Sequence, residues 1–179
     1  MIRRAFVLAA ASLTFVGLNL AGCASAPTPN PIASTARDSF YVKDATVDWQ
    51  FDDKTNTDQA YLDGKADLTK RLAAAVADTF KASPAGSEPV RFVITVKSYF
   101  RLSGAQQILI GGADNVIADV HVVNLNDGKE IGVYSNIRGS RTPPAGLLGA
   151  AISAASHDDV VGIVSSSFAK DLRKHFDEQ

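Results

Sequence analysis

The amino-acid sequence predicts an α+β domain: a two-layer sandwich with two helices on one face of a mostly antiparallel, four-stranded sheet. Apolar and polar residues alternate in four segments, as in strands that bury one face. In two other segments apolar residues recur every four positions, as on amphipathic helices. The segments follow the order β-α-β-β-β-α. A helix separates the first two strands, so we expect these strands to be parallel and joined by a right-handed crossover.

The first two strands are predicted at residues 40–51 and 90–102. In the first, apolar residues from Ala45 to Phe51 alternate with acidic residues and threonine. The second contains the longest alternation in the chain and is typical of a half-buried strand. Its expected inward residues are Val90, Phe92, Ile94, Val96, Phe100 and Leu102.

A hairpin is predicted to supply the third and fourth strands, residues 115–125 and 130–140. Gly128 lies between them and can adopt the positive φ that a tight turn requires. The expected inward residues are Val116, Ala118, Val120 and Val122 on the third strand, and Ile131, Val133 and Ile137 on the fourth.

Two helices complete the predicted domain. The first is expected from Asp63, as its N-cap, to Ala82, before the helix-stopping sequence Ser-Pro-Ala-Gly. The last begins at Asp158 and Asp159. The apolar stripes are Leu68, Leu72, Val76 and Phe80 on the first helix, and Val160, Val164, Phe168, Leu172 and Phe176 on the last.

The N-terminus has the pattern of a secretory signal peptide, expected over residues 1–22. Two arginines precede 18 uncharged residues, which is short for a membrane-spanning helix. The segment ends in Leu20-Ala21-Gly22-Cys23, which resembles the bacterial lipobox. The resemblance implies cleavage before Cys23 and attachment of acyl chains such as palmitate to this residue, giving a stable membrane anchor. An uncleaved helical anchor is the alternative.

The resemblance also implies an address in the bacterial cell envelope. Ala24 follows the cysteine, and in enteric-type bacteria this favours sorting to the outer membrane, with the protein facing the periplasm. Residues 23–39 contain Pro27, Pro29 and Pro31 and are predicted to form an extended tether. Residues 40–179 then form one periplasmic domain, without a second cysteine for a disulfide.

Composition and motifs argue against an enzyme or a nucleic-acid-binding protein. Without the two arginines of the signal peptide, 16 basic residues face 19 acidic ones, so the protein has no basic excess for nucleic acid. His121, His157 and His175 lack the spacing of metal ligands, and we expect His121 to be solvated beside Asp119. Asp52-Asp53 is interpreted as a turn. No cofactor or metal site is predicted.

Two apolar connections are unusual, because connections are normally polar. Residues 103–113 contain Ile108, Leu109 and Ile110, and residues 142–156 contain Leu147 and Leu148. The predicted topology puts both at the end of the sandwich opposite the tether. They either cap the domain or form a contact patch for a partner protein, a second copy or a second membrane.

The sequence from Val90 onward resembles a group of small bacterial envelope lipoproteins classed as domains of unknown function. The resemblance rests on VRFVITVKSYFRL, ADVHVVNLNDGKEIG, the Gly/Ala-rich connection and the last helix. More loosely, the domain is similar to α/β modules of accessory lipoproteins in envelope machines. Together with the two apolar connections, these similarities favour a non-catalytic interaction module anchored to the membrane through Cys23. The alternative is a carrier that holds a lipid or another apolar ligand between sheet and helices.

Overall fold

A computed structural model describes residues 30–50, 59–81, 86–101, 113–142 and 159–178. Its elements, in chain order, are α1 (Ser34–Arg37), β1 (Phe40–Trp49), α2 (Gln59–Phe80), β2 (Glu88–Phe100), β3 (Asp114–Asn124), β4 (Glu130–Arg141) and α5 (Val160–Asp177). The strands form one sheet in the order β1-β2-β3-β4.

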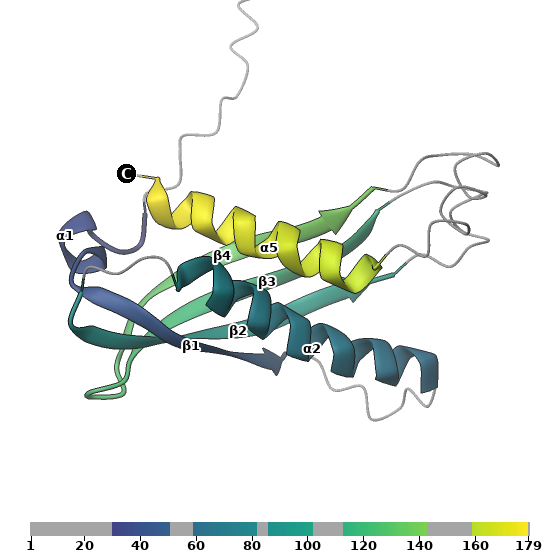
Figure 1. The fold of residues 1–179 in the computed structure, drawn as a ribbon, viewed down its shortest axis with the longest axis horizontal. Coiled ribbons are helices and arrows are strands. Elements are labelled where there is room, and N and C mark those ends of the chain that lie inside the picture. Colours follow the sequence, from purple (N-terminus) through teal and green to yellow (C-terminus); the bar gives the residue numbers. More distant parts are fainter. Residues whose placement is uncertain (1–29, 51–58, 82–85, 102–112, 143–158, 179) are drawn as a thin grey trace, which may run out of the picture.

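The predicted α+β fold is confirmed. The two long helices, α2 and α5, lie side by side on one face of the sheet (Figure 1). Strands β1 and β2 are parallel, whereas β2 with β3 and β3 with β4 are antiparallel. The predicted hairpin turn is also present, with Gly128 at φ 72°. Helix α2 begins at Gln59, four residues before the expected N-cap Asp63.

The core lies between the sheet and the two helices. Three phenylalanines from three elements meet in it: Phe80 of α2 lies 5.0 Å from Phe92 of β2 and 5.2 Å from Phe176 of α5, between ring centroids. Both predicted helical stripes face this core, although Val160 is only half-buried. Edge-to-face pairs of this kind fill space efficiently and add to the stability that burial provides.

A β-bulge corrects the predicted orientation of the end of β2. The pairing of β2 with β3 shifts between Val96 and Ser98, so Lys97 is an extra residue in the ladder. An extra residue exchanges the two faces of the strand beyond it. Tyr99 therefore packs against the core, whereas Phe100, which we expected inside, is exposed.

A second bulge corrects the expected inward residues of β4. The pairing with β3 shifts between Ala118 and Val120, opposite Ser135 and Asn136, and Asn136 has φ 58°. Before the bulge Tyr134 is the buried residue, and Ile131 and Val133 are only half-buried. After it, Ile137 is buried as predicted.

The domain packing includes residues that we assigned to the tether. Ile32 is buried against β4, and the Asn30 side chain bonds to three backbone carbonyls at the end of α5, those of His175, Phe176 and Glu178. Tyr134 donates a hydrogen bond to the same asparagine. The packed structure thus includes Asn30 and Ile32, which lie before the predicted domain boundary at residue 40.

Candidate partner-contact site

The topology brings the elements that border the predicted contact segments to one end of the domain. Strands β1, β2 and β4 finish there, and β3, α2 and α5 begin there, on the right in Figure 1. We call this the distal end. Asn30 lies at the other end, bonded to the last turn of α5. The chain therefore enters the domain at the end opposite to the distal one, as the sequence led us to expect.

The site residues predicted from the sequence lie outside the described residues. These are the lipidation residue Cys23 and the contact residues Ile108, Leu109, Ile110, Leu147 and Leu148. His157 and the Asp52-Asp53 turn also lie outside them. The described residues supply the strand ends and the helix starts that border the contact segments.

A buried ion pair joins the two strand ends that border the predicted contact segments. Asp114 starts β3, Arg141 ends β4, and the two residues are register partners. Arg141 Nη1 lies 3.1 Å from Asp114 Oδ2, and the side chains are only 7% and 1% exposed. Removing one partner of such a pair leaves a buried charge, so both residues are needed for the strand ends to pack as they do. Sequence patterning did not single out this pair.

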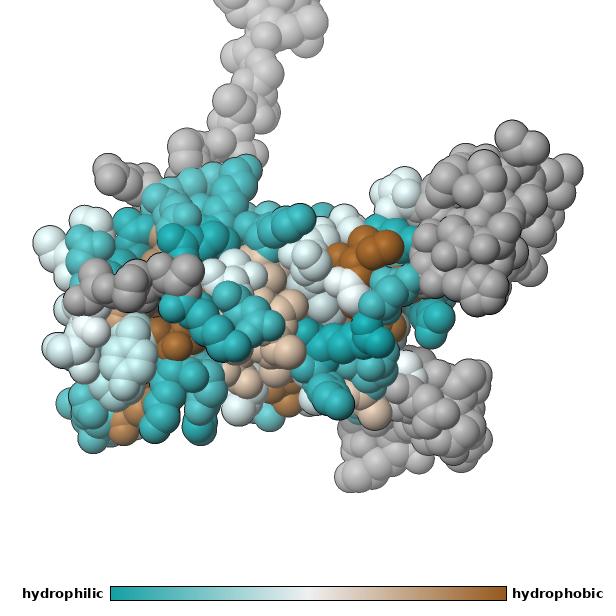
Figure 2. Space-filling view, viewed as in Figure 1, coloured by the Kyte–Doolittle hydropathy of each residue, from teal (hydrophilic) through white to brown (hydrophobic). Residues whose placement is uncertain are grey.

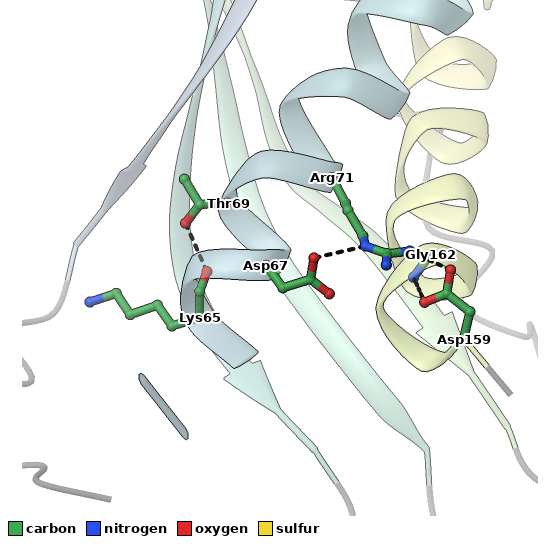
Figure 3. Close-up of polar contacts among 6 residues, drawn as sticks. All are labelled: Lys65, Asp67, Thr69, Arg71, Asp159 and Gly162. Atoms are coloured by element: carbon green, nitrogen blue, oxygen red, sulfur yellow. Dashed lines mark hydrogen bonds and ion pairs between the residues drawn. The ribbon is translucent and has the colours of Figure 1, made fainter. Parts of the chain in front are cut away.

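The start of α5 is fixed by a charged cluster that connects both helices (Figure 3). Asp159 is the N-cap of α5, at the predicted start of this helix, and its side chain accepts a hydrogen bond of 3.1 Å from the Gly162 N–H. Arg71 of α2 binds both Asp159 and, at 2.8 Å, Asp67. These hydrogen bonds, the one to Asp67 first, raise the pKa of Arg71 above its usual value. The cluster positions the first turn of α5 against α2.

The outward side of α5 near this cluster carries a shallow open groove of about 570 Å³. Ile163 is its large apolar residue and is 42% exposed. Its other lining residues are small or charged: Asp159, Gly162, Ser166, Ser167 and Lys170. Together with exposed Phe100 on the open face of the sheet, Ile163 gives the distal end two exposed hydrophobic side chains.

A polar cluster occupies the two bulges on the open face of the sheet. Lys97 Nζ contacts Asp119 at 2.9 Å and Asn136 at 2.8 Å, and the Asn136 N–H donates to Asp119. Burial alone would raise the pKa of Asp119, but the hydrogen bonds from Asn136 and Lys97 outweigh it and lower this pKa. The cluster holds both bulges, and through them it sets which residues face outward at the distal end.

The described residues offer little for metal chemistry. His121 lies on the polar sheet face as predicted, but it is half-buried, and its Nδ1 lies 2.7 Å from Glu130. His175 Nδ1 lies 2.9 Å from the backbone oxygen of Asp171. Among the residues that the structure describes, no group of three His, Cys, Asp or Glu side chains could hold a metal ion.

No protein-family model and no curated protein sequence matches the chain. Among solved structures, the chain is similar to a single-residue variant of the PelC dodecamer from Paraburkholderia phytofirmans. The identity is 16%, the match covers 85% of this chain and 95% of that one, and the TM-score is 0.35. A protein from Caulobacter crescentus CB15 that is proposed to be a lipoprotein matches at 11% identity, over 79% of this chain and 90% of that one, with a TM-score of 0.35. Similarity of this degree supports no conclusion about the activity of this chain.

Within the described ranges, none of the helices combines the length and the apolar character that crossing a membrane requires. The face of the domain in Figure 2 is mostly hydrophilic, with separate small apolar areas.

Proposed function

We propose that this protein is a lipid-anchored lipoprotein of the bacterial cell envelope that acts as a non-catalytic interaction module. Its contact site is the distal end, including residues 103–113 and 142–156, and its partner is an envelope protein or a second copy. The observation that carries the proposal is that the entry point of the chain and the predicted contact segments belong to opposite ends of the domain. The chain that leads from Cys23 enters at Asn30, whereas the elements bordering both apolar segments meet at the distal end. An anchored domain of this shape presents the distal end away from its own anchor.

The described core supports an interaction module more than a carrier. A carrier of a lipid needs an internal cavity. The space between the sheet and the helices contains instead the contacting rings of Phe80, Phe92 and Phe176. Organic extraction of the purified protein, followed by mass spectrometry, tests the carrier: a stoichiometric apolar molecule, beyond the acyl chains of the anchor, would favour it.

Photo-crosslinking in cells tests the interaction module with a matched pair of sites. Phe100 at the distal end and Tyr41 near the other end of the sheet are both exposed aromatic residues, at 45% and 39%. Replacing either by p-benzoylphenylalanine is therefore a conservative change. Leu109 and Leu148 are additional sites within the predicted contact segments.

We expect from Phe100, Leu109 or Leu148 a discrete protein adduct that Tyr41 does not give. The mass of the adduct distinguishes an envelope partner from a second copy. The same adduct, of equal mass and yield, from Tyr41 and Phe100 would show unspecific contact. The absence of adducts at all three distal sites would show that the distal end has no partner, and would contradict the proposal.

A further inference from the structure

The two edges of the sheet, β1 and β4, differ in how far other parts of the described chain cover them. Each edge strand of a sheet presents unpaired N–H and C=O groups that can bind another strand. We infer that the edge of β1 is a docking site for an extended segment of a partner protein, which adds a fifth strand to the sheet. This surface runs along the side of the domain, so it is separate from the distal contact site proposed above.

The backbone groups that face outward from β1 follow from its pairing with β2. The Gln50 N–H donates to the Val96 carbonyl, which places Gln50 among the residues that face β2. In a parallel ladder such residues alternate with residues that face away. Ala45 and Val47 therefore direct their N–H and C=O groups to the outside. Within the described residues, β1 pairs only with β2, and no hydrogen bond occupies these groups.

The β4 edge shows how this fold covers an edge. The Arg138 N–H donates to Asp171 at 3.0 Å, and the Ser140 N–H donates to Ser167 Oγ at 3.2 Å, both on α5. Further along β4, Ile32 packs against Gly132. Two N–H groups of β4 thus have side-chain acceptors, while those of Ala45 and Val47 have none in the described part.

Small side chains flank the β1 edge on the helix side. Trp49 of β1 donates a hydrogen bond to Thr69 of α2, so this side of α2 lies next to β1. Lys65, four positions before Thr69, lies over the Trp49 ring. Three alanines lie on this side as well: Ala66 and Ala73, three and four positions from Thr69, and Ala77, four positions beyond Ala73. They are exposed or half-buried, and a pale-brown area lies over the middle of α2 in Figure 2. Side chains of an added strand would have room beside them.

The charge around Asp48, on the other side of the edge, favours a basic occupant, whereas the exposed Lys43 lies next to Asp44 toward the start of β1. Asp48 is exposed on the open sheet face and forms no ion pair among the described residues, while Asp44 is paired with Arg91. An opposite charge across a strand pair is favourable, and a like charge is unfavourable. If two copies of the protein paired antiparallel through β1 with Thr46 at the centre, Asp44 of one copy would lie opposite Asp48 of the other. This like-charge contact disfavours a second copy as the occupant. The occupant that fits is an extended segment with small apolar residues toward α2 and lysine or arginine toward Asp48.

Amide hydrogen exchange measured by NMR on the protein purified from cells in detergent tests this inference. The probe is a seven-residue peptide of alternating valine and lysine with blocked ends. A peptide of the same composition with its residues in blocks, and an alternating peptide methylated on alternate backbone nitrogens, are the controls. Methylation removes the donors that a strand needs for pairing.

In the free protein we expect fast exchange at Ala45 and Val47. The alternating peptide should shift both amide signals and slow their exchange by about tenfold or more, and neither control peptide should. Val47→Pro removes an N–H that does not pair with β2, so the variant should fold. It should weaken peptide binding by about tenfold, while Val47→Ala binds like the unchanged protein. Crosslinking from Phe100 should remain unchanged in Val47→Pro, which separates this surface from the distal one.

Four results would overturn the inference. Slow exchange at Ala45 and Val47 in the free monomer would show that another part of the chain already covers the edge. Unchanged amide signals with saturating alternating peptide would show that the edge does not bind a strand. Equal binding of the methylated peptide would exclude backbone pairing. A dimer in analytical ultracentrifugation with both amides protected would assign the edge to a second copy.

Discussion

The two edges of the sheet differ although both strands are long and exposed to the same solvent. At β4, side chains of α5 accept backbone N–H groups, and the chain from Asn30 to Ile32 packs against the strand. At β1, α2 lies over the face of the strand, and the outward backbone groups of Ala45 and Val47 have no partner in the described residues. The comparison shows that α5 and the N-terminal segment cover the β4 edge, whereas the β1 edge has no such cover within the described residues.

Gly139→Ala should have the largest effect, because it disturbs the covered edge at its closest contact. A methyl group at Gly139 would overlap the Val164 carbonyl and lie 2.8 Å from Phe168 Cβ, so α5 would have to move away from β4. We expect a loss of about 3 kcal/mol in the free energy of unfolding, measured by urea denaturation.

Gly132→Ala is the matched control on the same strand. There the added methyl group meets mainly the Ile32 side chain, which belongs to the N-terminal segment and can shift. We expect a loss of about 1 kcal/mol. If Gly139→Ala cost no more than Gly132→Ala, the close packing of α5 on β4 would not be a main source of stability.

Alkaline pH should weaken the covered edge through Tyr134. Burial raises the pKa of this phenol from its ordinary value of 10.0 to about 12. Between these two values the unfolded chain loses the proton while the folded protein keeps it, so stability is complete below pH 10 and falls as the pH rises toward 12. The expected loss is about 2 kcal/mol.

Tyr134→Phe isolates this effect from the other groups that titrate at high pH. The unchanged protein should lose more stability between pH 10 and pH 12 than the variant, as measured by urea denaturation at each pH. Parallel loss in both proteins would mean that the Tyr134 hydroxyl does not contribute to the pH dependence.

Asp44→Asn on the open edge should have the smallest effect. The Asp44–Arg91 pair links β1 to β2, but its side chains are 38% and 40% exposed. We expect a change below about 0.5 kcal/mol, which decreases further with added salt. The hydrogen bond from Arg91 lowers the pKa of Asp44 below its ordinary value of 3.8, so any contribution is present above that pH and is lost as the pH falls through the lowered pKa. A loss above about 1 kcal/mol would show that β1 is held as firmly as β4.

The residues that sequence patterning placed wrongly lie next to the bulges. Phe100 was expected in the core and Tyr134 was not, because alternation was extended through Lys97 and through Asn136 without a break. Asn136 offered the one local signal, since asparagine adopts positive φ more readily than most residues. Lys97 offered none, because a lysine in a polar position fits an unbroken strand equally well.

The predicted lipidation site and contact residues stay predictions from the sequence. The lipobox at Cys23 and the apolar residues Ile108, Leu109, Ile110, Leu147 and Leu148 lie outside the described residues. The structure adds the buried Asp114–Arg141 pair and the Arg71–Asp159 cluster, which fix the elements bordering the predicted contact segments. Both depend on residues far apart in the sequence, and periodicity within one segment cannot reveal such pairs.

The sequence by itself determined the kind and order of the four strands and the two long helices, the parallel pairing of the first two strands, and most of the buried residues, but not the short helix α1. These properties follow from local periodicity and from the short range of chain connections. The tertiary structure decided which edge of the sheet is covered, where the strands bulge, and that Asn30 and Ile32 belong to the packed domain. These features depend on contacts between distant residues, whose free energy exists only once the chain has folded.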